Sequence, residues 1–236
     1  WGIKNYVEGA SYVGTVPVLL AAIGALLGRL RKSGFWIVLA IVSLLFMFGS
    51  PLYYVIYKLP GLSQVHSPFR WVYPYSLAMA VLAGIGIDAL LDRPARAALA
   101  GGWGRLCLWL AETVLPRASL IGGAALVGGL GLGLLVKGRL AELAGRVMLQ
   151  LAKAPEAFAD GRMFVSYQWR NLLIFGLALL AGGLALALLR RLRRPALWLG
   201  AAALTTVAEL LVIGMSFFPA VDPALVAYRT PGIDFL

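Results

Sequence analysis

The sequence is poor in the residues from which the catalytic and metal sites of soluble proteins are usually built. Its 236 residues contain one cysteine and one histidine, which excludes an internal disulfide and any metal site with two cysteines or two histidines. Only 13% of the residues are charged. No segment alternates like a strand, so the glycines within residues 118–136 are not the phosphate loop that follows a strand. We interpret them as positions of close helix packing.

What the sequence has instead is a series of long apolar runs. Hydrophobic residues make up 61% of the chain, and a helix needs about 20 mostly apolar residues to cross a bilayer. The runs are too continuous for the strands of a membrane barrel, which alternate with a period of two. They predict an all-α, polytopic bundle of about six transmembrane helices, near residues 10–28, 34–56, 71–87, 118–136, 172–189 and 196–218.

The basic residues indicate how these spans are oriented. The net charge is +11, but it is spread over helix ends and loops, which argues against nucleic acid as a partner. Two short basic clusters, residues 28–32 and 190–194, lie between predicted spans. Short basic loops stay in the cytoplasm, so both clusters and residues 88–117 are predicted to be cytoplasmic. Residues 58–70 and 137–171 are then predicted to be extracytoplasmic.

Two segments between the spans have the pattern of amphipathic interfacial helices. Residues 98–115 are apolar on one face, which includes Trp103 and Cys107, but Arg105 and Glu112 would be costly at the bilayer centre. We therefore predict an interfacial helix there rather than a seventh span. Residues 137–171 contain a second helix whose apolar residues recur at three- and four-residue steps. Its basic side is explained by solvent exposure, with an anionic lipid head group as the alternative.

The two ends of the chain indicate that it is part of a longer polypeptide. It begins at Trp1 rather than at methionine, and it ends at Leu236 shortly after a polar segment begins. We expect an internal fragment in which residues 1–218 form the membrane domain. Residues 219–236 are then the start of an extracytoplasmic domain, and the first residues also lie outside.

The loop at residues 49–70 is the first place where chemistry is expected. It is rich in aromatic residues and ends at Arg70, with His66 four residues earlier. A guanidinium at the mouth of a span can hold a phosphate through its planar set of donors. His66 can assist as a hydrogen-bond donor or an acid. Tyr53 and Tyr57 can contact a sugar ring or a lipid chain.

Each of these residues also has a purely structural interpretation. Tyrosines accumulate in the aromatic belt at the membrane surface, which accounts for Tyr53 and Tyr57 without any ligand. Arg70 can equally be an interfacial anchor, and His66 can make a structural hydrogen bond. The sequence leaves these alternatives open.

Two acids complete the set of candidates. Glu209 lies inside the last apolar run, so it is expected to face the bundle interior and to find a partner there. A proton relay, a cation site and an ion pair are the open interpretations. Glu8 precedes the first span and can pair with Arg70 or remain solvated. No cluster of metal ligands accompanies these acids, so no cofactor is predicted, although a divalent metal could share a phosphate with Arg70.

Three stretches resemble one family of membrane proteins. They are EGASYVGTVP at residues 8–17, the block at residues 59–88 that contains LPG, SPFR and LAGIGID, and Glu209 followed by FP at residues 218–219 and YRTP at residues 228–231. Together they resemble the YfhO family of large bacterial polytopic membrane proteins. The family has Asp at the position of Glu209 and Asn at the position of Phe218.

The resemblance implies a function that the residues alone do not. It implies the C-terminal part of a membrane domain similar to the GT-C glycosyltransferases of the bacterial cytoplasmic membrane. Such proteins move a sugar from a polyprenyl-phosphate carrier to an acceptor polymer of the cell envelope. The catalytic acid of that superfamily would precede Trp1, so no catalytic residue is assigned here. Arg70 would stabilise the phosphate leaving group, with Glu209 orienting it.

Two other functions remain as alternatives. A transporter or flippase of lipid-linked substrates would also need basic groups outside and an acid within the membrane. Many secondary transporters have internal repeats and broken helices, and neither is evident in this sequence. A non-catalytic membrane scaffold is the other alternative, and it suits the scarcity of polar residues.

Overall fold

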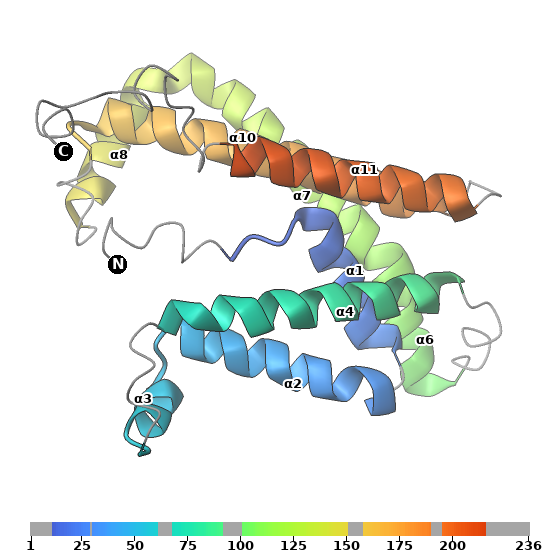
Figure 1. The fold of residues 1–236 in the computed structure, drawn as a ribbon. Helices are drawn as coiled ribbons and strands as arrows, with labels where there is room; N and C mark the ends of the chain where they lie inside the picture. The colour runs from blue at the N-terminus through green and yellow to red at the C-terminus, as the bar shows by residue number, and fades with distance from the viewer. Residues whose placement is uncertain are drawn as a thin grey trace, which may run out of the picture.

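The computed structural model describes residues 11–28, 30–60, 68–91, 101–150, 158–189 and 195–215. Within these ranges the chain forms helices and no strand, and most of the helices run side by side in one bundle (Figure 1). The predicted fold class, an all-α helical bundle, is confirmed.

Twelve helical elements of different lengths make up the described part of the chain. In order they are α1 (Thr15–Leu27), α2 (Leu30–Met47), α3 (Pro51–Tyr57), η3 (Pro68–Trp71), α4 (Val72–Leu91), α6 (Gly102–Trp109), η4 (Leu110–Val114), α7 (Leu115–Gly133), η5 (Leu134–Val136), α8 (Lys137–Gln150), α10 (Gly161–Leu189) and α11 (Pro195–Gly214). Four continuous helical stretches are long and apolar enough to cross a membrane: Pro68–Leu91, Gly102–Gln150, Gly161–Leu188 and Ala196–Gly214. The chain is therefore a helical membrane protein.

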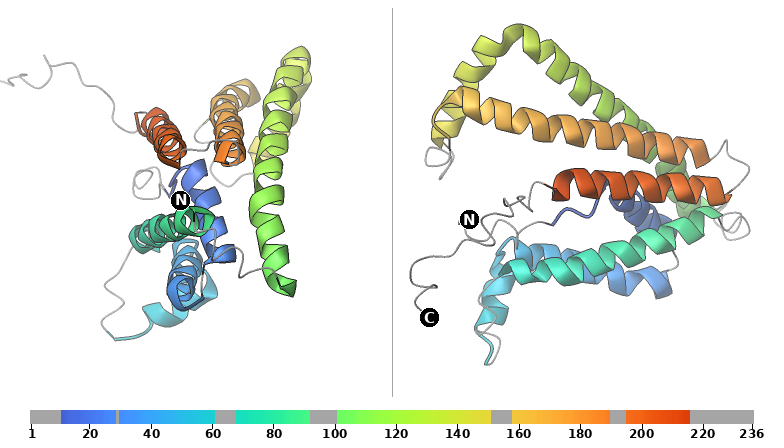
Figure 2. Two further views of the ribbon diagram at one scale, coloured as in Figure 1. Left: turned by 90° about the vertical axis from the view of Figure 1, so that its right-hand side faces the viewer. Right: turned by 45° about the horizontal axis from the view of Figure 1, so that its top comes forward.

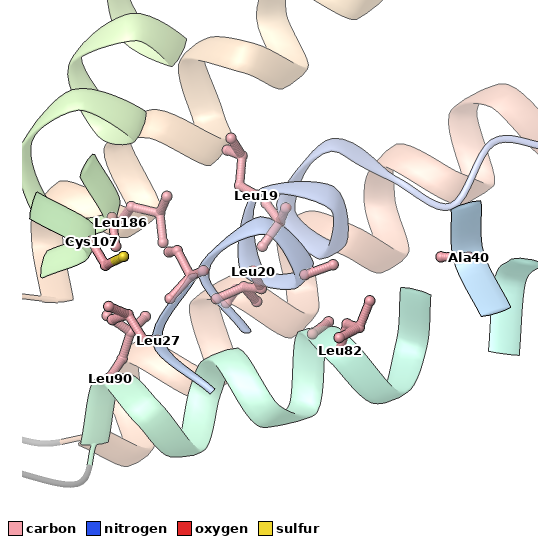
Figure 3. Packing of buried hydrophobic residues seen from close by; sticks show 14 of the residues in the cluster. Leu19, Leu20, Leu27, Ala40, Leu82, Leu90, Cys107 and Leu186 are labelled. Carbon is pink, nitrogen blue, oxygen red and sulfur yellow. The ribbon is translucent and has the colours of Figure 1, made fainter. Parts of the chain in front are cut away.

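The short helix α1 lies at the centre of the bundle. It packs against α4 on one side and against α10 and α11 on the other (Figure 2). The pairs α2–α4 and α7–α10 form the two flanks, and α8 folds back onto α10. In Figure 3, Leu27, Leu90 and Cys107 meet from α1, α4 and α6, while Leu20 and Leu82 meet further along the α1–α4 contact.

Glycines allow α1 and α4 to approach closely. A Cβ atom at Gly24 would lie 2.0 Å from the carbonyl oxygen of Leu82, and one at Gly86 would lie 2.0 Å from the carbonyl oxygen of Leu20. Small residues at such crossings bring the two backbones together, which is how helices commonly associate in membranes. The close contact between these helices therefore depends on the absence of a side chain at Gly24 and at Gly86.

The glycines of α7 behave differently from one another. Gly123 meets α10, because a Cβ atom there would lie 2.8 Å from the carbonyl oxygen of Gly176. Gly122, Gly128 and Gly129 have no atom within 4 Å of such a Cβ, apart from their own helix and chain neighbours. The interpretation of these glycines as packing positions holds at Gly123 and does not extend to its neighbours.

Two hydrogen bonds from side chains attach neighbouring helices to α10. The indole Nε1 of Trp198 donates to the carbonyl oxygen of Ala185 at 2.6 Å, and the Trp198 side chain is buried. The hydroxyl of Ser119 in α7 donates to the carbonyl oxygen of Leu179 at 2.7 Å. Both bonds use carbonyl groups already engaged in the helix, so they hold α11 and α7 in register with α10 without leaving a polar group unpaired.

The first apolar run differs from the span expected at residues 10–28. The helix covers only Thr15–Leu27, and residues 11–14 lead into it without helical structure. Thirteen residues of helix extend about 20 Å, whereas the hydrocarbon core is about 30 Å thick. Gly14 has a φ angle of 92°, which is incompatible with a helix and unfavourable for residues other than glycine. The chain therefore enters the bundle extended and becomes helical inside it.

The helix predicted to lie on the membrane surface at residues 98–115 is joined to the next span. The π-helical turn η4 connects α6 to α7, and the whole of Gly102–Gln150 is one continuous helical stretch. Its expected apolar face is divided, because Cys107 is buried in the core whereas Trp103 is 76% exposed. The segment is amphipathic, but one part of its apolar surface packs against the bundle.

Helix α10 begins well before the span expected at residues 172–189. The side chain of Asp160 accepts a hydrogen bond from the backbone N–H of Met163 at 2.7 Å, which caps the start of the helix. The 29 residues of α10 include Arg162 and Arg170, and the span predicted at residues 172–189 forms the second part of this helix. The second amphipathic helix expected in this region is present as α8.

The helix ends next to the predicted basic clusters lie at one end of the bundle. The start of α2 lies at the same end as the start of α6, the end of α10 and the start of α11 (Figure 1). We name this the basic end, because the start of α2 carries Arg31 and Lys32. The opposite end, named here the α8 end, carries α3, η3, α8, the start of α10 and the end of α11. This arrangement agrees with the predicted order of loops, while the side of the membrane that each end faces stays a prediction.

Candidate functional site

Glu209 is buried within α11 and binds the beginning of α1. Its two carboxylate oxygens accept the backbone N–H of Thr15 at 3.0 and 2.9 Å. The Thr15 hydroxyl donates to Oε1 at 2.5 Å, and the Tyr12 hydroxyl donates to the same oxygen. Only 8% of the Glu209 surface is exposed. The acid therefore has the interior partner that was expected, and that partner is a helix N-terminus.

This contact explains how α1 can start inside the bundle. The first N–H groups of a helix have no partner within the helix, and an unpaired N–H is costly in a membrane interior. A carboxylate satisfies them and is favoured at the positive end of the helix dipole. Gly14 lies against the acid, and a Cβ atom there would sit 3.5 Å from Oε2 of Glu209.

The hypothesis that Glu209 orients Arg70 finds no support in the described part of the chain. The carboxylate is engaged by neutral donors of residues 12–15. Arg70 lies in η3 at the start of α4 and is exposed. The described ranges contain no ion pair between these two residues.

A groove opens between α10, α11 and the extended segment that precedes α1. Its volume is about 690 Å³. The polar side chains along it include Tyr167, Arg170 and Asn171 of α10, and apolar walls come from residues such as Phe175 and Val212. We name it the α10–α11 groove. Its residues belong to the first half of α10 and the last residues of α11, so it lies toward the α8 end.

Tyr12 connects this groove to the buried acid. Its ring lines the groove, and its hydroxyl donates to Glu209. A ligand that moved Tyr12 would uncover the carboxylate and the N-terminus of α1. The Arg170 guanidinium and the Asn171 amide therefore lie along a largely apolar groove, and Tyr12 connects this groove to the buried Glu209 carboxylate.

Aromatic rings lie at the Phe158 side of the groove. The Phe158 ring is 5.2 Å from that of Phe164 and 5.6 Å from that of Tyr167, measured between centroids. Aromatic rings provide flat apolar surface, with a polar tip in the case of tyrosine. Such surfaces suit the apolar face of a sugar or an isoprenoid chain.

The candidates of the loop at residues 49–70 are gathered around Phe46 at the end of α2. The Phe46 ring lies 4.6 Å from that of Trp71 and 5.8 Å from that of Tyr53. Tyr57 follows, 6.3 Å from Tyr53. Arg70 adjoins Trp71, so the structure brings Tyr53, Tyr57 and the backbone of Arg70 to the same corner of the α8 end.

The aromatic corner offers phenol hydroxyls, which can both donate and accept hydrogen bonds. The packing of Phe46, Tyr53 and Trp71 is equally what an aromatic belt requires.

Three remaining predictions lie outside the described residues. These are His66, Glu8 and the start of an extracytoplasmic domain at residues 219–236. Among the residues that the structure describes, no group of three or more His, Cys, Asp or Glu side chains is placed to hold a metal ion.

Tyr12, Arg170 and Asn171 were not predicted as site residues. Residues 137–171 were predicted to form an outer loop, so Arg170 and Asn171 were not considered as part of a helix face. The signal was present, because Met163, Tyr167, Arg170 and Ile174 recur at three- and four-residue steps and all line the groove. The contribution of Tyr12 depends on contacts with α11, about 200 residues away in the chain, and has no local signal.

Comparisons with protein-family models, curated proteins and solved structures found no match for this chain. The resemblance to the YfhO family rests on the three stretches of sequence that carry it, and it stays a prediction.

Proposed function

We propose that this protein is a glycosyltransferase-like membrane protein that moves a sugar from a polyprenyl-phosphate carrier to an acceptor of the bacterial cell envelope. The observation that carries the proposal is the α10–α11 groove, in which Arg170 and Asn171 lie beside aromatic and aliphatic walls. A lipid-linked sugar phosphate has the matching parts: an apolar chain, an anionic phosphate and a polar ring.

Each part of the groove has a role in this proposal. Sugar transfer breaks the bond between the anomeric carbon and the phosphate oxygen, and negative charge grows on the phosphate. Arg170 stabilises that charge through its guanidinium donors, and Asn171 adds a neutral donor. Phe158 and Phe175 accompany the apolar chain, while Tyr167 contacts the sugar.

The remaining steps involve groups that are not assigned in this chain. An acceptor hydroxyl forms the new bond to the anomeric carbon and gives its proton to a general base. The resemblance implies that this base precedes Trp1. Arg70, Tyr53 and Tyr57 then form a second candidate surface at the same α8 end for the acceptor or the carrier head group, with His66 nearby in sequence.

The proposal takes the α8 end as the extracytoplasmic side. The reason is that the helix ends next to the short basic clusters lie at the opposite end, and short basic loops are retained in the cytoplasm. The groove then opens toward the leaflet in which envelope polymers are modified.

The test is sugar transfer by the full-length protein in proteoliposomes with a polyprenyl-phosphate sugar as donor. Replacing Arg170 with Ala is expected to lower release of sugar from the carrier by about 100-fold, the usual effect of losing one donor to a developing negative charge. Arg146→Ala is the matched control, because Arg146 is exposed on α8 and pairs with Glu142. Unchanged transfer by a folded Arg170→Ala variant would refute the role of the groove.

One observation favours a second candidate, a transporter or flippase of lipid-linked substrates. The helix α1 starts inside the bundle at a buried acid, and many transporters likewise have helix ends near the middle of the membrane. The same proteoliposomes separate the two functions. Movement of an intact fluorescent lipid-linked sugar to the other leaflet, with no sugar released from its carrier, would favour transport.

A further inference from the structure

A second groove lies between α8 and α10, on a different side of α10 from the first. Its volume is about 540 Å³. Leu134 of η5, Leu140 of α8 and Val165 and Trp169 of α10 form apolar walls. We name it the α8–α10 groove. Ser166 lines both grooves, but the cations and aromatic residues of the two are different.

The fold back of α8 onto α10 creates this space. The α7 helix passes through η5 into α8, which turns toward the start of α10 (Figure 2). The two helices touch closely at Gly161, where a Cβ atom would lie 2.2 Å from the carbonyl oxygen of Ala141. At the other side, a Cβ atom at Gly133 would lie 3.1 Å from the Trp169 ring. These contacts fix both edges of the groove and leave its middle open.

The charge around the groove is positive. Lys137 at the start of α8 and Arg162 at the start of α10 both line it. The nearest described acids are engaged elsewhere. Glu142 pairs with Arg146 at 3.0 Å on the exposed face of α8, and Asp160 caps α10. Two cations therefore border an apolar depression with no acid among its lining residues.

The surroundings indicate a lipid rather than an aqueous ligand. Leu135, beside the groove, is 81% exposed, and Leu132 one turn earlier is 68% exposed. Side chains of this kind require the hydrocarbon region of a membrane. The groove thus lies where the apolar surface of α7 gives way to the basic helix α8, which is the level of lipid head groups.

We propose that the α8–α10 groove is a binding site for one anionic phospholipid of the surrounding leaflet. An acyl chain packs against Leu140, Val165 and Trp169, and the phosphate lies between Lys137 and Arg162. The bound lipid fills the space between α8 and α10. This site is independent of the function proposed for the α10–α11 groove, because lipid binding here requires neither Arg170 nor a chemical reaction.

The experiment is native mass spectrometry of the detergent-solubilised full-length protein, titrated separately with phosphatidylglycerol, phosphatidylcholine and polyprenyl phosphate. The wild type is expected to bind one phosphatidylglycerol molecule in preference to phosphatidylcholine. The variant Lys137→Gln/Arg162→Gln is expected to bind it about 30-fold more weakly, since each cation beside an anionic head group contributes about fivefold. Its matched control is Arg139→Gln/Arg146→Gln, which removes the same charge from α8 without touching the groove lining.

A second variant tests the apolar wall while keeping both cations. Val165→Trp fills the groove and is expected to lower phosphatidylglycerol binding while the helical circular dichroism stays unchanged. If the two charge variants lost phosphatidylglycerol binding to the same extent, the lipid would be attracted to the basic surface in general. That result would overturn the proposed site. Equal binding of phosphatidylcholine would overturn it as well, and so would preferential binding of polyprenyl phosphate, which would make the groove a substrate site.

Discussion

Glu209 shows how a single charged residue can organise a membrane bundle. A carboxylate within a span is costly unless it has partners. Here its partners are the backbone N–H and hydroxyl of Thr15 and the hydroxyl of Tyr12. The carboxylate pairs with donors that would be costly if left unpaired in the bundle interior, and these donors stabilise the carboxylate in turn. The acid and the start of α1 therefore depend on each other.

Removing the Glu209 carboxylate is therefore expected to destabilise the protein. Glu209→Leu leaves the donors of Thr15 and Tyr12 unpaired, and each buried unpaired donor costs about 1–3 kcal/mol. The free energy of unfolding in detergent is expected to fall by about 2–5 kcal/mol on this basis. Glu209→Gln keeps one acceptor oxygen and is expected to lose less. Thermal unfolding followed by circular dichroism measures both.

The matched control at this scale is Glu142→Gln. Glu142 is an exposed acid that pairs with Arg146, one turn away on α8. Such a pair contributes about 0.3–0.5 kcal/mol. If Glu209→Leu destabilised the protein no more than Glu142→Gln does, the contact with α1 would not be what permits the helix to start inside the bundle.

Among the helices, the crossing of α1 and α4 decides the position of the central helix. It depends on Gly24 and Gly86, whose backbones lie against those of Leu82 and Leu20. A helix of 13 residues has few turns with which to make contacts. Close approach to α4 provides the packing that its length alone does not.

An added methyl group at this crossing is expected to separate the two helices. Gly86→Ala places a Cβ atom 2.0 Å from the carbonyl oxygen of Leu20, a backbone atom that cannot turn aside. Overpacking of this kind costs about 1–3 kcal/mol. Gly84→Ala on the same helix is the control, because no such atom lies within 4 Å of its Cβ. Similar unfolding temperatures for the two variants would contradict this account of the crossing.

For the whole molecule, the exposed apolar surface and the distribution of charge describe one orientation in a bilayer. Large apolar side chains such as Ile121 and Leu135 are 68% and 81% exposed, which a lipid environment explains. The helix ends next to the basic clusters lie at one end of the bundle, and both grooves lie toward the other. The proposed substrate and phospholipid sites therefore share one leaflet.

Cysteine labelling tests this orientation in intact cells. Cys107 is buried, and Cys107→Ala provides the background for two single-cysteine variants. Lys58→Cys at the α8 end is expected to react with a membrane-impermeant maleimide in intact cells. Gly101→Cys at the basic end is expected to react only after permeabilisation, because short basic loops stay in the cytoplasm. The reverse pattern would place both grooves on the cytoplasmic side and refute sugar transfer outside.

The extent to which the sequence predicted this arrangement can be judged from particular elements. The apolar run at residues 71–87 appears as α4 with a few added residues, since hydrophobic length is a local property. The run at residues 172–189 lies within α10, which begins earlier, at Gly161, and also includes Arg162 and Arg170. Glu209 was correctly expected to face the interior, but its partner was not foreseen.

The sequence by itself determined that this chain is a bundle of membrane helices, because a bilayer requires long apolar segments with internally paired backbones. Only the tertiary structure decided that the first helix begins at Thr15, inside the bundle, and that Tyr12 and Thr15 meet Glu209, 194 residues beyond Thr15. The same holds for the two grooves of α10. Their shape depends on how helices distant in sequence pack, which no local pattern of residues records.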